Sequence, residues 1–210
     1  MAPLTRVRIV DTAVTLADRD GFEAVTLRRI AAELGVHVTS LYNHLPTREA
    51  VTDGMVERLL EEAELPCSPI GWEEWVRHFF TAMGALAERH PGAFTALQRR
   101  PVQGPKATTT FEVAVGAFAR AGLGPADAYS AVKATTLTAL AVGEERGIRS
   151  SGQLLETSLE DLPEAEFPNV RSLVVADQPE AAWDFTLEVL VSGLRANIRR
   201  LKAAGRSGTP

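Results

Sequence analysis

Hydrophobic residues recur at helical spacing through most of the chain, and the most informative instance lies between Thr26 and Leu45. The first half of this stretch has four apolar residues at the i, i+3, i+4, i+7 spacing of a one-sided helix: Leu27, Ile30, Ala31 and Leu34. Thr26 suits the N-cap of that helix, and Gly35 suits its end, where glycine adopts a left-handed conformation easily. The pattern therefore predicts a short helix followed by a tight turn.

A second short helix is predicted to begin near Val38. Leu41 and Leu45 supply its inner face, and the remaining side chains are polar or amphipathic: His37, Thr39, Ser40, Tyr42, Asn43 and His44. Two helices around a tight turn, the second with exposed hydrogen-bonding groups, are what a helix-turn-helix needs to reach base edges in a major groove. An ordinary helical hairpin whose polar face meets water fits these residues equally well, and the neighbouring segments favour the helix-turn-helix.

Amphipathic segments flank this stretch on both sides. Before it, residues 4–19 place apolar residues on one stripe, and Asp20-Gly21 closes the predicted helix. After it, Thr47 suits the N-cap of a further helix that continues to about Glu62. Arg48 begins this helix, so we expect it and the free amides of the helix N-terminus to meet a DNA phosphate; a solvated charge is the alternative.

A proline-rich break at residues 66–71 separates this part of the chain from the rest. We therefore expect a helix-turn-helix domain over residues 1–47, a connecting helix over 48–65, and a larger helical domain over 71–204. Helical spacing predicts five helices in the larger domain: residues 72–89, 93–97, 108–121, 126–143 and 179–202. A long, partly mobile connection is expected over residues 150–178, with short turns at Leu154-Leu155 and 173–175. The predicted fold class is all-α.

Two of these helices carry more apolar surface than one side needs. The 126–143 helix is apolar nearly all round, so it has to be buried on both sides. The 179–202 helix has two apolar stripes, one of which contains Leu187, Leu190, Val191, Leu194, Ile198 and Leu201. We expect both helices to form a four-helix bundle with a second copy across a two-fold axis, which makes the protein a homodimer. The alternative is a monomer that folds the 126–143 helix wholly inside.

Composition narrows the class of protein. The chain has 210 residues, 45% of them hydrophobic, which suits one or two domains with a real core. Cys67 is its one cysteine, which rules out an internal disulfide. No segment resembles a signal peptide, and the most apolar run, residues 128–142, is too short for a membrane span and contains Lys133. We therefore expect a cytoplasmic protein without membrane contact.

Charge is distributed unevenly along the chain. The net charge is −5, yet residues 1–48 hold six Arg and five acids, whereas residues 144–190 hold eleven acids and three Arg. The acidity thus lies away from the candidate DNA surface. Because cations are few near the recognition helix, we expect a modest number of phosphate contacts and a reliance on dimerisation.

The sequence has no recognisable catalytic set. It lacks a Gly-x-Ser-x-Gly elbow, a phosphate-binding glycine loop, a His-Glu-x-x-His motif and paired cysteines, so we expect no enzyme activity, no cofactor and no metal site. His78 and His90 are expected at the surface or at a pocket rim.

Side chains of the larger domain can line a ligand cavity, since such sites are mostly apolar with a few polar anchors. The candidate pocket residues are Phe79, Met83, Phe94, Leu97, Phe111, Phe118, Thr135, Thr138 and Trp183, accompanied by Thr110 and Thr136. The alternative is that the same residues simply form the core that any helical domain needs.

The helix-turn-helix stretch resembles a known family. The residues that carry the resemblance are Phe22, Thr26-Leu27, Ile30-Ala31, Leu34-Gly35-Val36, Leu41-Tyr42, His44 and Arg48-Glu49. They are similar to the N-terminal signature of the tetracycline-repressor (TetR) family of bacterial regulators, with Leu45 where that family usually has an aromatic residue. The resemblance implies an all-α homodimer that binds palindromic operators and releases them when a small molecule enters the second domain.

The second domain is similar to the tetracycline-repressor branch of that family. The motifs that fall in the same order are His90-Pro91-Gly92, Arg100-Pro101, residues 118–128, Phe167-Pro168, Trp183 and Phe185. Where that branch has a histidine for the drug-bound magnesium, just before Arg-Pro, this chain has Ala96-Leu97. We therefore expect no magnesium requirement.

These observations predict a ligand-responsive transcriptional regulator, acting as a repressor on double-stranded operator DNA, with an effector that remains to be identified. Phosphate contacts are expected from Thr26, Arg28, Tyr42 and Arg48, and base contacts from His37, Val38, Thr39 and Asn43, with Ser40 and His44 on the same face. Two rival functions stay open: a DNA-binding regulator whose second domain docks a protein partner, and a helical enzyme in which the N-terminal hairpin has no role.

Overall fold

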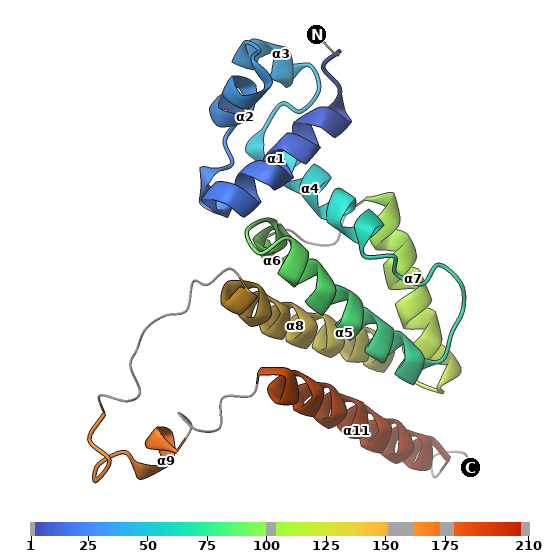
Figure 1. The fold of residues 1–210 in the computed structure, drawn as a ribbon. Coiled ribbons are helices and arrows are strands. Elements are labelled where there is room, and N and C mark those ends of the chain that lie inside the picture. Colours follow the sequence, from blue (N-terminus) through green and yellow to red (C-terminus); the bar gives the residue numbers. More distant parts are fainter. Residues whose placement is uncertain (1–2, 100–103, 151–161, 173–178, 207–210) are drawn as a thin grey trace.

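The computed structural model describes residues 3–99, 104–150, 162–172 and 179–206. All regular elements in these residues are helices (Figure 1). In chain order they are α1 (Arg6–Asp20), the 3₁₀ turn η1 (Phe22–Ala24), α2 (Leu27–Leu34), α3 (Val38–Tyr42), α4 (Arg48–Glu62), α5 (Trp72–Arg89), η2 (Ala93–Thr95), α6 (Ala96–Arg99), α7 (Pro105–Arg120), α8 (Pro125–Ser150), α9 (Pro168–Arg171) and α11 (Pro179–Arg206). The prediction of an all-α fold is confirmed.

Threonines cap three of the four helices in the N-terminal part, α1, α2 and α4. The hydroxyl of each accepts a hydrogen bond from an amide of the first helical turn: Thr5 from Arg8 (3.2 Å), Thr26 from Arg29 (3.2 Å) and Thr47 from Ala50 (3.1 Å). Such caps satisfy amides that have no partner inside the helix. The expected caps at Thr26 and Thr47 are therefore confirmed.

Two helices of the larger domain are longer than their sequence pattern predicts. α7 begins at Pro105, three residues before the expected Thr108, because proline fits the first helical turn without needing an amide. α8 runs to Ser150 instead of Gly143. Gly143 and Gly147 do not end it, because both are packing sites: a Cβ at Gly143 would lie 2.8 Å from the Phe94 ring, and one at Gly147 would lie 2.9 Å from the Ala87 carbonyl oxygen.

The helices form two packed groups joined by α4 (Figure 1). In the first group, α1 packs against α2 and against the first part of α4, and α3 closes the small core. Buried residues from each of these helices meet there: Ile9, Ala13, Leu16, Ile30, Leu41, Leu45, Val51 and Met55. This group is called the head below. The second group, called the body, consists of α5, α7 and α8, with α11 packed along α5 and α8.

The body is held together by aromatic side chains and by a close approach of α11. The indole of Trp75 stacks on Phe79 with ring centroids 5.1 Å apart and meets the edge of Phe118 at 6.2 Å. Trp183 of α11 packs on Phe80, and it can do so because a Cβ at Gly84 would lie 2.8 Å from the indole. These contacts bury one face of α11 in the single chain.

The other faces of α8 and α11 remain exposed in the single chain. Tyr129 and Leu137 of α8 are 51% and 58% exposed, and Phe185 and Val189 of α11 are 71% and 55% exposed. The alternative of a monomer that folds the 126–143 helix wholly inside is therefore wrong, and the burial of its other side against a second copy stays a prediction. In the expected long connection, residues 162–172 include the short helix α9, and the short turns expected at Leu154-Leu155 and 173–175 lie outside the described residues.

Candidate DNA-binding face and internal cavity

A left-handed glycine sets the angle between α2 and α3. Gly35 has φ 65° and ψ 34°, and the amide that follows it, that of Val36, donates to the carbonyl of Ala31 at 3.0 Å. This arrangement closes α2 and turns the chain at once into α3. A residue with a Cβ would be strained at this φ, so the turn depends on the glycine.

Two buried leucines hold α3 with its polar side outward. Leu41 and Leu45 are 0% and 1% exposed and enter the core of the head. The predicted base-contact and phosphate-contact residues of α3 and its flanks are exposed or half-buried, and Val38 also packs against the core: His37, Val38, Thr39, Ser40, Tyr42, Asn43 and His44. The structure thus brings all seven onto one short helix and its ends, at the tip of the head (Figure 1).

His37 and Thr39 are bonded to each other at the start of α3. The Thr39 amide donates to His37 Nδ1 at 3.4 Å, and the Thr39 hydroxyl lies 2.8 Å from the same nitrogen. Since an amide can only donate, Nδ1 carries no proton and the hydroxyl donates to it as well. The ring of a neutral His37 therefore carries its proton on Nε2.

Three of the six arginines in residues 1–48, Arg19, Arg29 and Arg48, are paired with acids. Arg19 binds Asp20 and Glu33, and its hydrogen bonds lower the pKa of both carboxyls. Arg48 donates to Glu23 at 3.0 Å and to the Phe22 carbonyl at 3.3 Å, with its guanidinium over the Phe22 ring. Arg28, in contrast, is exposed, and its side chain has no partner among the described residues.

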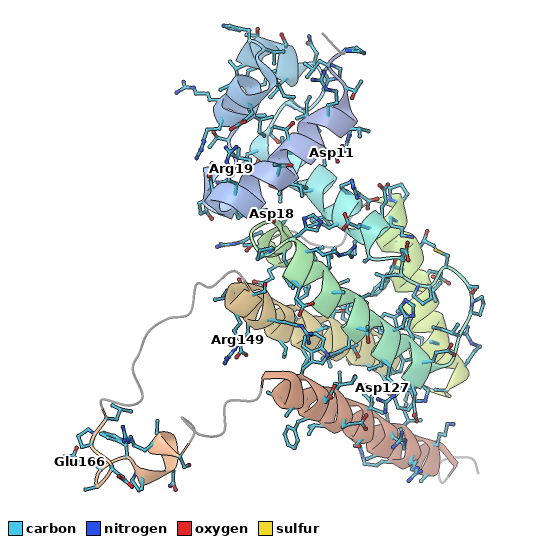
Figure 2. The ribbon with its side chains drawn as sticks, in the orientation of Figure 1. Asp11, Asp18, Arg19, Asp127, Arg149 and Glu166 are labelled. Carbon is cyan, nitrogen blue, oxygen red and sulfur yellow. The ribbon has the colours of Figure 1, made fainter. Side chains whose placement is uncertain are left out.

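His90 lies where α1, α4 and the end of α5 meet. Its Nδ1 is 2.7 Å from Asp18 of α1, and its Nε2 is 3.1 Å from Glu62 of α4. Asp18 also accepts from the Ala93 amide at 2.9 Å, so it ties the last turns of α1 to the body (Figure 2). We call these groups, His90, Asp18 and Glu62, the junction.

Charge strengthens the junction. The hydrogen bond to Asp18 raises the pKa of His90, and although burial opposes this, the Glu62 carboxylate adds to the rise. Burial works to raise the pKa of Glu62, but the His90 hydrogen bond and the nearby Arg89 and Arg58 hold it below its usual value. The expectation of a surface or pocket-rim position for His90 is thus replaced by a position between head and body.

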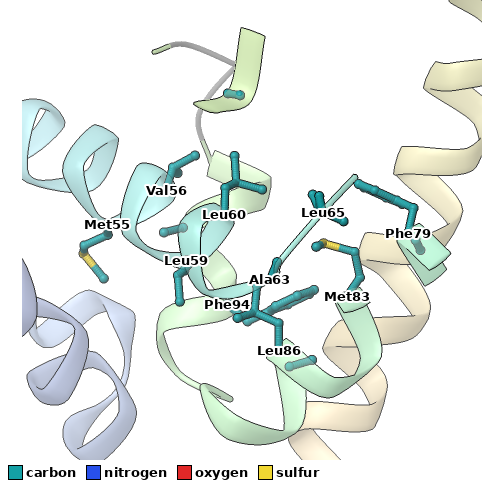
Figure 3. Close-up of a cluster of buried hydrophobic side chains, with 14 of the residues drawn as sticks. Met55, Val56, Leu59, Leu60, Ala63, Leu65, Phe79, Met83, Leu86 and Phe94 are labelled. Carbon is teal, nitrogen blue, oxygen red and sulfur yellow. The ribbon is translucent and has the colours of Figure 1, made fainter. Parts of the chain in front are cut away.

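A cavity of about 70 Å³ lies between α4 and the helices α5, α6, α7 and α8. Its lining residues are Val56, Leu60, Trp75, Phe79, Met83, Leu97, Ala107, Thr110, Phe111, Ala114, Val132, Thr136 and Leu140. Four of the predicted pocket residues, Phe79, Met83, Leu97 and Phe111, are among them. Val56 and Leu60 approach from α4 toward the side of the body that holds Phe79 and Met83 (Figure 3).

The other five predicted pocket residues lie elsewhere, each for a packing reason. Phe94 and Phe118 are buried in the helix contacts, where they meet Gly143 and the Trp72 and Trp75 rings respectively. The hydroxyls of Thr135 and Thr138 bond the carbonyls four residues earlier in α8. Trp183 holds α11 on α5 and stacks with Arg146.

Sequence reasoning missed the contribution of α4 to the cavity. Val56 and Leu60 carry the same apolar spacing as the residues that α4 buries in the head, so nothing in their pattern separates a cavity wall from a core. Trp75 was foreseeable, because it stands one helical turn before Phe79 on the inward face of α5. Among the described lining residues none is charged.

The described part of the chain contains no cluster of three or more His, Cys, Asp or Glu suited to a metal ion. None of its helices is long and apolar enough to span a membrane.

Comparisons with known proteins cover both parts of the molecule. Residues 9–53 match the family model for bacterial regulatory proteins of the tetR family. An HTH-type transcriptional regulator of Saccharopolyspora erythraea is 31% identical over 202 residues, which are 92% of this chain and 85% of that protein. Among solved structures, ActR of Streptomyces coelicolor in complex with actinorhodin superposes with a TM-score of 0.78 at 27% identity, covering 94% of this chain and 99% of ActR.

The glycine turn, the outward polar face of α3 and the helical body define a helix-turn-helix transcriptional regulator that binds DNA. The regulator from Saccharopolyspora matches nearly the whole chain, and the family model matches the head. The chain belongs to the TetR family of bacterial regulatory proteins.

Proposed function

We propose that this protein is a homodimeric repressor that acts in the cytoplasm, binds a palindromic operator through α3, and releases it when a small molecule enters the cavity. One observation carries the proposal. α4 is a wall of the cavity through Val56 and Leu60, and the same helix buries Val51 and Met55 in the head. A ligand that displaces α4 therefore moves the DNA-binding face.

The base contacts that we propose come from His37, Val38, Thr39 and Asn43. The Nε2–H of a neutral His37 is a donor suited to guanine N7 or O6. The Thr39 hydroxyl gives its proton to His37, so its oxygen is left to accept from an amino group of adenine or cytosine. Val38 suits a thymine methyl group, and Asn43 suits adenine.

The phosphate contacts come from Thr26, Arg28, Tyr42 and Arg48 in this proposal. Arg28 is the one most ready to act, since its exposed guanidinium has no competing partner among the described residues. Arg48 is held by Glu23, whose side chain is 73% exposed, so a phosphate can replace that carboxylate. Ser40 and His44 lie on the same face and add hydrogen-bonding groups beside the backbone.

The second copy that we propose binds the exposed apolar faces of α8 and α11. Tyr129, Leu137, Phe185 and Val189 are large apolar side chains left in water in the single chain. Large exposed apolar surfaces mark interaction sites, and two-fold pairing lets one face serve both copies. The helix-turn-helix domain (1–47), the connecting helix (48–65) and the ligand-binding and dimerisation domain (71–204) then act as three units, and the paired bundle sets the separation of the two helix-turn-helix domains.

The route of release that we propose begins with the size of the cavity. At about 70 Å³ it is far below the several hundred Å³ that a drug-sized ligand occupies. An effector must therefore push its walls apart. Glu57 of α4 accepts from the amides of Lys106 and Ala107 at the start of α7, at 3.2 and 3.4 Å, so displacement of α7 pulls on α4.

The last residue of α4, Glu62, is tied to α1 by the junction. Glu62 bonds His90, and His90 bonds Asp18 of α1, so a shift of α4 also strains the contact between α1 and the body. Relatives support a small-molecule signal: ActR is known in complex with actinorhodin and with (S)-DNPA, and a 27% identical relative is the class D tetracycline repressor of Escherichia coli.

Selection from a random duplex library tests the proposal. The wild-type protein should enrich a palindrome whose half-sites lie about one helical turn apart, or a multiple of it, and sedimentation should show one dimer on the selected duplex. Arg28→Ala should weaken binding to all duplexes, whereas Arg200→Ala, at the far end of α11, should leave it unchanged. Failure to enrich any palindrome, or binding by a monomer, would contradict the proposal.

A further inference from the structure

The indole nitrogen of Trp75 is a buried donor without an acceptor. The side chain is 1% exposed and lines the cavity, and its Nε1 has no hydrogen-bond partner among the described residues. An unpaired buried donor costs roughly 1–3 kcal/mol, so native structures rarely keep one without a reason. Here the reason can lie in the cavity that the ring adjoins.

The two hydroxyls in the cavity wall also lack a hydrogen-bond partner. Thr110 and Thr136 have no hydrogen bond to any described residue. Their neighbours behave differently: Thr108 and Thr109 of α7, and Thr135 and Thr138 of α8, each donate to the carbonyl four residues earlier. Among the threonines of α7 and α8, the two that line the cavity are therefore free to bond a molecule inside it.

The rest of the described wall contains no charged side chain. The other described lining residues are aliphatic or aromatic, so an ionised group in the cavity would have no counter-charge there. Burying an unpaired charge in such surroundings costs far more than one hydrogen bond returns. A neutral ligand with a flat ring system matches the wall, because it can lie against Trp75, Phe79 and Phe111.

We propose that the effector is an uncharged, ring-containing organic compound whose oxygen acceptor, a ketone, quinone or lactone carbonyl, receives the Trp75 Nε1–H. The hydroxyls of Thr110 and Thr136 bond further oxygens of the same molecule. This inference rests on the proposed function, since it names the chemistry of the ligand that the cavity takes.

Water is the competing partner for these groups. The cavity has room for a few water molecules, and a buried water needs two to four polar partners. A single water finds enough partners here only if the polar groups of Trp75, Thr110 and Thr136 all point to one position. The two cases differ when the carbonyl is removed from a probe. The affinity should fall if that carbonyl accepts from Trp75, and it should stay the same if a water does.

Three probes that share one bicyclic skeleton separate these cases. They are tetralin, which has no acceptor; tetralone, which adds one ketone; and tetralin carboxylate, which adds a charge. Calorimetric titration of the full-length protein should show tetralone binding roughly three- to tenfold more tightly than tetralin, the fold-change of one net hydrogen bond. The carboxylate should bind more weakly than both.

Variants assign the difference to the indole. Trp75→Phe keeps an aromatic ring beside Phe79 and removes the N–H donor together with part of the indole, so it should no longer distinguish the two neutral probes. Trp72→Phe is the matched control, because Trp72 packs on Phe118 and is not part of the described lining, and it should keep the preference for tetralone. Thermal unfolding of both variants verifies that they are folded.

Every outcome decides the inference. Equal binding of tetralin and tetralone to the wild type, a preference that survives in Trp75→Phe, tighter binding of the carboxylate, or no binding of any probe would overturn it. None of these results touches the DNA-binding test. Loss of the proposed function would appear instead as failure to enrich a palindrome.

Discussion

The DNA-binding face and the cavity are built in opposite ways. The face of α3 is polar and exposed, and two buried leucines hold it from beneath. The cavity is apolar, and side chains of five helices meet in its wall. The face is therefore formed before DNA arrives, whereas the cavity has to open for its ligand. Since α4 packs in the head through Val51 and Met55 and lines the cavity through Val56 and Leu60, the release that we propose passes through this helix.

The largest expected effect comes from removing the support of the face. Leu41→Ala deletes a fully buried side chain of the head and should lower the free energy of unfolding by about 3 kcal/mol, with loss of DNA binding. Val7→Ala on α1 is the control: Val7 is 65% exposed, so about 0.5 kcal/mol or less is expected. Chemical denaturation measures both. If Leu41→Ala costs no more free energy of unfolding than Val7→Ala, the Leu41 side chain does not hold α3 in the core of the head.

The next effect concerns the backbone contact between head and body. A Cβ at Gly92 would lie 1.9 Å from the Ala17 carbonyl oxygen, so Gly92→Ala must push α1 away from the body and should cost about 2 kcal/mol. Gly71→Ala, where a Cβ meets nothing within 4 Å, should be nearly neutral. If both variants unfold at the same denaturant concentration, head and body do not touch at this point.

A smaller effect tests the link between the cavity and α4. Glu57→Ala removes the carboxylate that caps α7 and should cost about 1 kcal/mol. Amide exchange at Lys106 and Ala107 should become faster. Glu61→Ala lies on the same helix, exposed and without a partner among the described residues, and should change neither quantity. Unchanged amide exchange at Lys106 and Ala107 in Glu57→Ala would show that Glu57 does not link α4 to α7.

The smallest effect is a pH dependence that the junction gives to stability. The pKa of His90 is raised in the folded protein, so its stabilisation is complete below the unfolded pKa of about 6.5 and is lost as pH rises through the folded pKa. The pKa of Glu62 is lowered, so its contribution is present above about 4.5 and is lost as pH falls through the folded pKa. The junction is therefore strongest in mildly acidic solution.

Urea unfolding from mildly acidic to mildly alkaline pH measures this dependence. His90→Gln should remove the extra loss of stability that the wild type shows on the alkaline side, by an amount on the order of 1 kcal/mol. His78→Gln is the control, because His78 is exposed and bonds a backbone carbonyl rather than an acid. Identical profiles for the wild type and His90→Gln would show that the junction does not titrate as described.

Locality explains which features the sequence predicts. The turn at Gly35, the caps at Thr26 and Thr47, and the inner face of α3 depend on residues within a few positions of one another, and these were predicted correctly. The polar face itself was predicted from the residues that are left once Leu41 and Leu45 are turned inward.

Features made by distant residues were not predictable in the same way. The partners of His90 lie 72 and 28 residues away, so its place in the junction leaves no local signal. The same holds for Gly143, which a sequence pattern treats as the end of α8 but which packs against Phe94. Helical spacing identifies an inward residue, and it does not tell a cavity wall from a solid core, as Phe111 and Phe118 illustrate.

Base substitution through the selected operator tests the central claim, that α3 reads the DNA, most directly. Binding of the wild type, Thr39→Ala and Tyr42→Ala is measured against duplexes changed at one symmetric pair of positions at a time. We expect Thr39→Ala to lose discrimination at a single position of each half-site, by roughly 1–3 kcal/mol, and Tyr42→Ala to weaken binding to every duplex equally. An equal loss at every position for both variants would contradict it.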